Sequence, residues 1–269
     1  MFRDITLGQY YPSDSAVHRL DPRTKLGMTL LYIVMLFVVD NLLGYVLCAV
    51  WILGWIALSK ISLGYMLRGL RVVVFLMALS VVFNLFLTKG EVIWSWRSLS
   101  ITREGVRQAV KMAARITMLI LGSSLLTFTT RPMELTAGLE QGLGFLKKVG
   151  VPVHEIAMMM SIALRFLPIL TEETDRIRKA QMARGADFDS GSLMQRAKAM
   201  VPLLVPLILS AFRRAGDLTT AMEARCYHGG EGRTRMKPLH YRKADAWAWI
   251  ATAVFTAAAI LIRCLENAA

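Results

Sequence analysis

Residues 26–59 are apolar except at Asp40 and Asn41, and this run is too long for one membrane helix. With a rise of 1.5 Å per residue, a single α-helix of that length would reach roughly 50 Å. The hydrocarbon core of a bilayer is about 30 Å thick and is spanned by about 20 apolar residues. The run therefore predicts two short membrane helices joined by a tight turn at Asp40 and Asn41.

Further apolar runs predict three more membrane helices, at residues 72–88, 110–130 and 244–262. Of the 269 residues, 55% are hydrophobic and only 19% are charged, which is too apolar for an ordinary soluble domain. The chain is therefore predicted to be an all-α membrane protein with about five transmembrane helices.

Lysine and arginine are distributed unevenly between the loops, and this asymmetry predicts the orientation in the membrane. Residues 1–25 contain four of them, the 60–71 loop three and residues 131–243 eighteen, whereas residues 89–111 on the other side contain five. We expect a multi-pass protein of the cell membrane with its N-terminus and residues 131–243 in the cytoplasm. The net charge of +13 does not indicate nucleic-acid binding, because the basic residues form no single stripe with interleaved aromatic residues.

The polar region at residues 131–243 holds two shorter apolar runs, at 156–170 and 200–212. Their lengths of 15 and 13 residues are more typical of buried or interfacial helices than of membrane spans. Prolines, which disturb helices, lie inside both runs, at Pro168, Pro202 and Pro206.

This pattern predicts a cytoplasm-facing coupling domain of three amphipathic helices. One is short, at 133–148, and two are long and crossed, at 153–184 and 193–225, with stop signals between them. The chain is thereby divided into an N-terminal segment with four membrane helices, the coupling domain and a C-terminal membrane helix, at residues 1–130, 131–243 and 244–269.

The same short sequence ends each of the two predicted long helices. Residues 180–185 read Ala-Gln-Met-Ala-Arg-Gly and residues 221–226 read Ala-Met-Glu-Ala-Arg-Cys. At a spacing of three, the two alanines of each copy share a helix face that another backbone can approach, and arginine offers five donors in a rigid fork. Ordinary C-capping explains one copy as well, since basic residues and glycine are common at helix ends. Two copies at matched positions favour a docking site for another protein.

These paired motifs, with Leu-Asp-Pro-Arg-Thr-Lys at 20–25 and Leu-Arg-Phe-Leu-Pro at 164–168, resemble the transmembrane T component of energy-coupling factor (ECF) transporters, the CbiQ-like family called EcfT. The likeness covers most of the chain. In that family the T component joins two ABC ATPases, of the EcfA and EcfA′ type, to an interchangeable substrate-binding membrane protein, the S component. The resemblance implies that this chain transmits ATP-driven motion of the ATPases to the S component and so supports vitamin or micronutrient uptake.

In the family, the motif arginines sit in grooves on the ATPases, and by position this role falls to Arg184 and Arg225. The expected ATPase-docking residues are Ala183, Arg184, Gly185, Ala224, Arg225 and Cys226. Cysteine at 226 departs from the family pattern, which has glycine there. Because cysteine would be strained at a positive φ, we expect the second helix to end by a different geometry from the first.

The stretch at 224–234 is similar to T components that serve several vitamin S components in turn. A methionine-rich surface agrees with this, because flexible thioether chains repack against different partners, although core packing explains such methionines equally well. The expected S-component interface comprises Met158, Met159, Met160, Leu164, Leu167, Leu203 and Leu207.

The sequence predicts no cofactor, no metal site and no catalytic residue. The glycine-rich stretch at 229–234 is not a phosphate-binding loop, because Tyr227 stands where the first glycine is required and Arg233 where lysine is required. Any ATP must therefore be bound by other chains. Cys48, Cys226 and Cys264 are too scattered for a disulfide framework and are expected to be free thiols.

Two other classes of protein remain open. A conventional ABC importer permease would use one coupling helix and pair with a similar chain around the transport pathway. An intramembrane hydrolase would use Glu172 and Glu173, but Arg176 follows the second glutamate by three residues, not by the four found in prenyl-endopeptidase-type proteases. A solvated, salt-bridged helix face explains these glutamates better. Neither alternative accounts for the doubled arginine motif.

Overall fold

The structure, a computed structural model, describes residues 10–88, 90–96, 99–188, 190, 192–230, 236 and 238–268. It divides into two compact units. Residues 8–142 and 239–269 form what we call the bundle unit, and residues 143–238 form the paired-helix unit.

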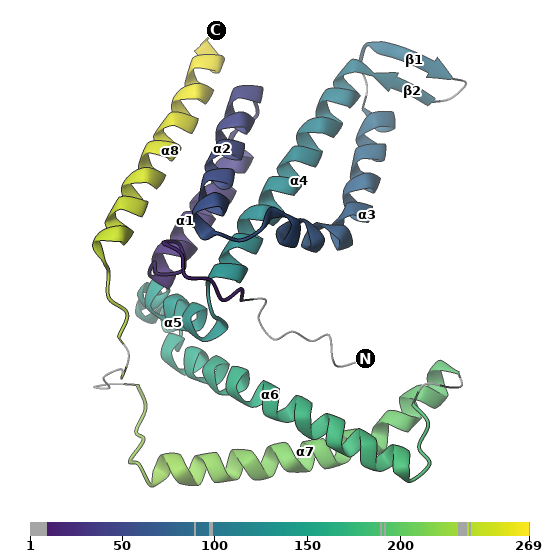
Figure 1. Cartoon of the computed structure of the whole chain (residues 1–269), viewed down its shortest axis with the longest axis vertical. Helices are drawn as coiled ribbons and strands as arrows, with labels where there is room; N and C mark the ends of the chain where they lie inside the picture. The colour runs from purple at the N-terminus through teal and green to yellow at the C-terminus, as the bar shows by residue number, and fades with distance from the viewer. Residues whose placement is uncertain are drawn as a thin grey trace. The chain divides into compact units, whose positions relative to one another are not determined.

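The bundle unit contains six of the helices and a short hairpin (Figure 1). They are α1 (Pro22–Val38), α2 (Leu42–Ser59), α3 (Leu63–Leu87), β1 (Val92–Trp96), β2 (Leu99–Thr102), α4 (Arg103–Thr129), α5 (Pro132–Gly142) and α8 (Lys243–Ala268). The predicted turn between the first two helices is confirmed, since Asn41 caps α2 by accepting a hydrogen bond from the backbone N–H of Gly44 at 2.9 Å. The antiparallel hairpin of β1 and β2 was not predicted.

The core of the bundle unit lies between α1, α2, α4 and α8. Leu36, Cys48, Leu121 and Phe255 contribute buried side chains to one apolar cluster. The rings of Trp51 and Phe255 stack with centroids 4.6 Å apart, which joins α2 to α8.

Arg115, near the predicted outer end of α4, has partners in the turn between α1 and α2. Its guanidinium donates to the carbonyl oxygen of Val39 at 3.2 Å and to the carboxylate of Asp40 at 3.3 Å. This ion pair joins α4 to the turn and stabilises it.

The paired-helix unit consists of a 3₁₀ helix, η1 (Gly144–Val149), and the long helices α6 (Val153–Ala183) and α7 (Leu193–Glu223), which cross each other (Figure 1). Ser192 and Gln195 form a capping box that begins α7. The predicted short helix at 133–148 is instead divided into α5 and η1, because glycines at 142 and 144 weaken a continuous helix. α5 belongs to the bundle unit, and the paired-helix unit begins at residue 143.

Among the described helices, five are long and apolar enough to cross a membrane: α2, α4, α6, α7 and α8. The number agrees with the prediction, but the membership differs. α1 has 17 residues and the apolar part of α3 is Val73–Phe86, so both predicted spans fall short of this length. α6 and α7 qualify because the apolar runs at 156–170 and 200–212 continue past isolated charges such as Glu155 and Lys198.

Candidate functional site

The first arginine motif ends α6 with a Schellman cap. The backbone N–H of Gly185 donates to the carbonyl of Met182 at 3.0 Å, and that of Ala186 donates to the carbonyl of Gln181 at 3.0 Å. Gly185 has φ +85°, the left-handed conformation that this cap requires and that glycine adopts without strain. Arg184 is therefore held at a fixed position one residue before the reversal of the chain.

The second motif ends α7 in the same way. The N–H of Cys226 donates to the carbonyl of Glu223 at 2.9 Å, and that of Tyr227 donates to Met222 at 3.1 Å. Cys226 has φ +53°, so cysteine occupies the left-handed position that glycine fills in the first motif. The expectation of a different geometry is wrong, because the two backbone hydrogen bonds outweigh the unfavourable conformation of cysteine. The two motifs thus present Arg184 and Arg225 on matching backbones.

Both motifs are open to the surroundings. The two alanines, the arginine and the cap residue of each copy are exposed, namely Ala180, Ala183, Arg184, Gly185, Ala221, Ala224, Arg225 and Cys226. Within the described part of the chain, neither guanidinium forms a hydrogen bond or an ion pair. The two helix ends lie at opposite ends of the crossed pair (Figure 1). Each tip offers a bare patch and five unused donors, which is suited to binding carbonyl groups or carboxylates on another protein.

Arg225 also lines a groove of about 470 Å³ between the end of α7 and the first half of α6. Arg165 lines the same groove from α6, so two arginines border it. The chain after α7 closes one side, where Gly230 packs so tightly on the ring of His154 that no Cβ fits. The end of α7 is thereby held against the start of α6 as well as by its own cap.

An ion pair fixes the crossing of the two long helices. Arg214 of α7 donates to Glu173 of α6 at 2.9 Å, and both side chains are about one-third exposed, at 34% and 30%. The predicted salt-bridged face is confirmed for Glu173, whereas Glu172 is exposed. No cluster of three potential metal ligands among His, Cys, Asp and Glu occurs in the described residues. The contact with Arg214 gives Glu173 a structural role.

Comparison with known proteins identifies the family. The family model for CbiQ, the cobalt transport protein, matches residues 13–236. An EcfT protein of Thermosediminibacter oceani, named energy-coupling factor transporter transmembrane protein, is 56% identical and covers 97% of this chain and 98% of its own. Proteins of the same name from Acidaminococcus fermentans and Lactococcus lactis are 54% and 42% identical, over 91% and 96% of this chain and 92% and 98% of their own. The chain belongs to the EcfT family.

As a member of the EcfT family, the chain is a membrane subunit of an ECF transporter. The paired-helix unit carries all thirteen residues that the sequence assigns to partner binding. Met159 and Met160 are strongly exposed, at 58% and 50%, and Met158 and Leu164 are partly exposed. Leu203, in contrast, is buried within this chain.

The exposed apolar face of α7 lies next to Leu203 and Leu207, the two α7 residues predicted from the sequence to contact the S component. It consists of Met200, Val201, Leu204, Val205, Ile208, Leu209 and Phe212, each about half or more exposed. Leu203 and Leu207 lie on a less exposed stripe that continues to Arg214, the residue that contacts α6. Arg214 shares this face because it lies seven and eleven residues after 207 and 203, close to whole turns of the helix. Only its contact with Glu173 of α6 identifies the face as the inner one.

Sequence reasoning used the segment at 20–25 only as a mark of family resemblance, but the structure gives its charged residues specific partners. Asp21 caps α1 by accepting from the backbone N–H of Arg23 at 2.9 Å, and Pro22 begins the helix. Burial opposes ionisation of Asp21, but hydrogen bonds from Arg23 outweigh it and keep the pKa of this carboxyl below its usual value. Arg23 in turn lies 4.0 Å from the centroid of the Tyr241 ring, which joins α1 to the segment before α8.

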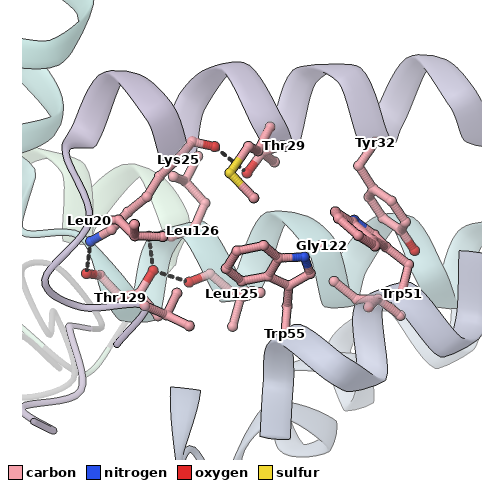
Figure 2. A pocket seen from close by; sticks show the side chains of 13 residues that line it. Leu20, Lys25, Thr29, Tyr32, Trp51, Trp55, Gly122, Leu125, Leu126 and Thr129 are labelled. Carbon is pink, nitrogen blue, oxygen red and sulfur yellow. Dashed lines mark hydrogen bonds between the residues drawn. The ribbon is translucent and has the colours of Figure 1, made fainter. Parts of the chain in front are cut away.

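Lys25 stabilises the end of another helix. Its ammonium group is buried and donates to the carbonyl oxygen of Thr129, the last residue of α4, at 2.9 Å, as Figure 2 shows. A second bond runs to the carbonyl of His18 at 3.1 Å. Carbonyls at a helix C-terminus lack partners within the helix and favour a positive charge. The pocket beside Lys25, lined by Trp51 and Trp55, is small at about 50 Å³.

A matched pair of substitutions tests the role of the left-handed position in the two caps. Gly185→Ala is expected to lower the free energy of unfolding by about 1 kcal/mol, since an L-residue is strained there, although the site has room for a Cβ. Cys226→Gly removes the same strain and is expected to raise the unfolding temperature by ~2 °C. Thermal unfolding of the complete purified chain provides the measurement.

Gly216→Ala is the control, because this glycine lies inside α7 without a positive φ and with open space around it. It is expected to stabilise the helix by about 0.5–1 kcal/mol. Equal effects of alanine at 185 and 216 would show that the cap conformation is not required.

Proposed function

We propose that this chain couples ATP hydrolysis in two bound ABC ATPases to movement of an S component, for uptake of a vitamin or another micronutrient. Membership of the EcfT family supports the transporter role, and the matched helix tips support the coupling role. The single observation that carries the proposal is that Arg184 and Arg225 stand exposed on the same Schellman geometry at the two ends of one crossed helix pair.

In this proposal each arginine is held in a groove of one ATPase. Nucleotide-driven closure of the ATPases moves the two tips relative to each other and so changes the angle between α6 and α7. The cytoplasmic orientation of the tips rests on the excess of lysine and arginine in residues 131–243. A partner can shift such an equilibrium only through contacts that differ between its two states, so both tips must be attached.

The apolar face of α7, rather than the stripe of Leu203 and Leu207, is proposed as the α7 part of the S-component surface. Together with Met159 and Met160 of α6 it provides exposed apolar side chains on both helices of the pair. Methionines and branched aliphatic residues can repack against different partners, which agrees with a T component that serves several S components.

Purification of the chain from native membranes tests the proposal. We expect two ATPase subunits and an S component to be recovered per copy of this chain. A ratio of one ATPase to one copy of this chain, without any small membrane partner, would instead support a conventional permease. Recovery of this chain alone, in a membrane fraction that retains transport activity, would contradict the coupling role.

A further inference from the structure

An apolar groove of about 590 Å³ runs along the bundle unit between α2 and α8. Every side chain that lines it is apolar or aromatic, from positions 47–58 of α2 and 247–258 of α8. Both helices are long and apolar enough to cross a membrane. Val50, Trp247 and Val254 on its walls are 63%, 71% and 65% exposed, so this chain itself leaves the groove largely uncovered.

Small residues on both helices leave space in the groove. Gly54 lies between Trp51 and Trp55, and a Cβ at this position meets no atom within 4 Å. On α8, Ala251 and Ala258 also line the groove with small side chains. Water gains few hydrogen bonds in an apolar space of this kind, so the occupant must itself be apolar over the length of the groove.

Positive charge gathers at one end of the groove. α2 ends at Ser59, so the exposed Lys60 comes two residues after the last groove residue of α2, Leu58. On α8 the exposed Lys243 is four residues before Trp247 and therefore lies on the same face, one turn beyond the groove. The nearby carboxylate of Asp14 is paired with Arg19 at 2.7 Å. A long apolar groove with lysines only at one end is complementary to a molecule that has a long apolar chain and an anionic head group.

We propose that this groove binds an anionic phospholipid. One acyl chain lies between α2 and α8 over Gly54, and Lys60 and Lys243 bind the phosphate. The exposed ring of Trp247 lies at the boundary between the two, a position that tryptophan favours at membrane interfaces. A helix of a partner protein could also fill the groove. An apolar helix, however, has no phosphate or other anion at its end to bind Lys60 and Lys243, whereas a phospholipid does.

The test uses the complete chain with its native partners, reconstituted in nanodiscs of phosphatidylglycerol and phosphatidylcholine with identical acyl chains. After extraction, native mass spectrometry counts the lipids that stay bound. Each lysine near a phosphate contributes about 1 kcal/mol, a factor of about five, so Lys60→Gln with Lys243→Gln should reduce retention of phosphatidylglycerol about 25-fold. Arg103→Gln with Arg107→Gln removes two other exposed charges and should have no such effect.

Gly54→Leu tests the acyl chain separately. Leucine fits the free space at this position and fills the groove, so the fold should be kept while retention of both lipids falls about tenfold or more. Ala57→Leu on the exposed face of the same helix is the control. Unchanged lipid retention in either test variant overturns the proposal. Unchanged retention together with loss of a membrane partner in Gly54→Leu identifies the groove as a protein interface instead.

Discussion

Replacing Arg184 and Arg225 together with alanine is expected to abolish ATP-driven uptake and to release the ATPases. Truncating one partner of a buried, charged contact costs about 2–5 kcal/mol, which weakens binding by about 30-fold to 4,000-fold at each tip. Each single variant should therefore keep some ATPase but lose most transport, because one tip cannot change the angle of the helix pair alone. The measurements are co-purification of the ATPases and substrate uptake into proteoliposomes.

The fold should survive this change. Both arginines are exposed and lie beyond the last helical residues, so the unfolding temperature should shift by less than ~3 °C. Arg176→Ala with Arg213→Ala is the matched control, since it removes one exposed arginine from each long helix away from the tips. The docking role is refuted if the tip variant binds both ATPases and transports as well as this control. Lysine at both tips should restore only part of the activity, because it lacks the planar fork.

Local signals in the sequence were sufficient for the turn between α1 and α2, the end of α6 and the start of α7. Asn41, Ser192 and the glycine after Arg184 each mark a helix end by the hydrogen bond or the backbone conformation that they supply. Cys226 shows where such signals fail. Its type argues against a left-handed conformation, but the carbonyls of Met222 and Glu223 need donors, and the chain satisfies them by the same route as in α6.

The inner and outer faces of α7 could not be predicted from its own sequence. The run at 200–212 is apolar on all sides, so periodicity does not distinguish a face that packs from one that is open. The choice is made by α6, through the contact of Glu173 with Arg214, and a contact between residues 41 positions apart leaves no local pattern. The membrane helices show a related ambiguity, because α6 and α7 have the length and apolarity of spans while α1 and α3 do not.

No pattern in the sequence marks Asp245 as a structural residue, although the structure gives this buried residue two hydrogen bonds. It lies in the first turn of the last helix and is 1% exposed. One carboxylate oxygen accepts from the backbone N–H of Arg242 at 2.8 Å, which caps the start of α8. The other accepts from the N–H of Asp21 at 2.8 Å, from a residue 224 positions earlier. A single carboxylate therefore joins the beginnings of α1 and α8.

Asp245→Ala is expected to destabilise the bundle unit by about 3–5 kcal/mol, because two buried N–H groups lose a charged acceptor. The unfolding temperature of the purified chain should fall by ~10 °C. Asp14→Ala is the matched control: its carboxylate is 77% exposed and paired with Arg19 on the surface, so its loss should leave the unfolding temperature almost unchanged. Equal unfolding temperatures for the two variants would show that the carboxylate does not hold α1 and α8 together. Because Arg184 and Arg225 belong to the other unit, the Asp245 variant should still bind the ATPases below its unfolding temperature.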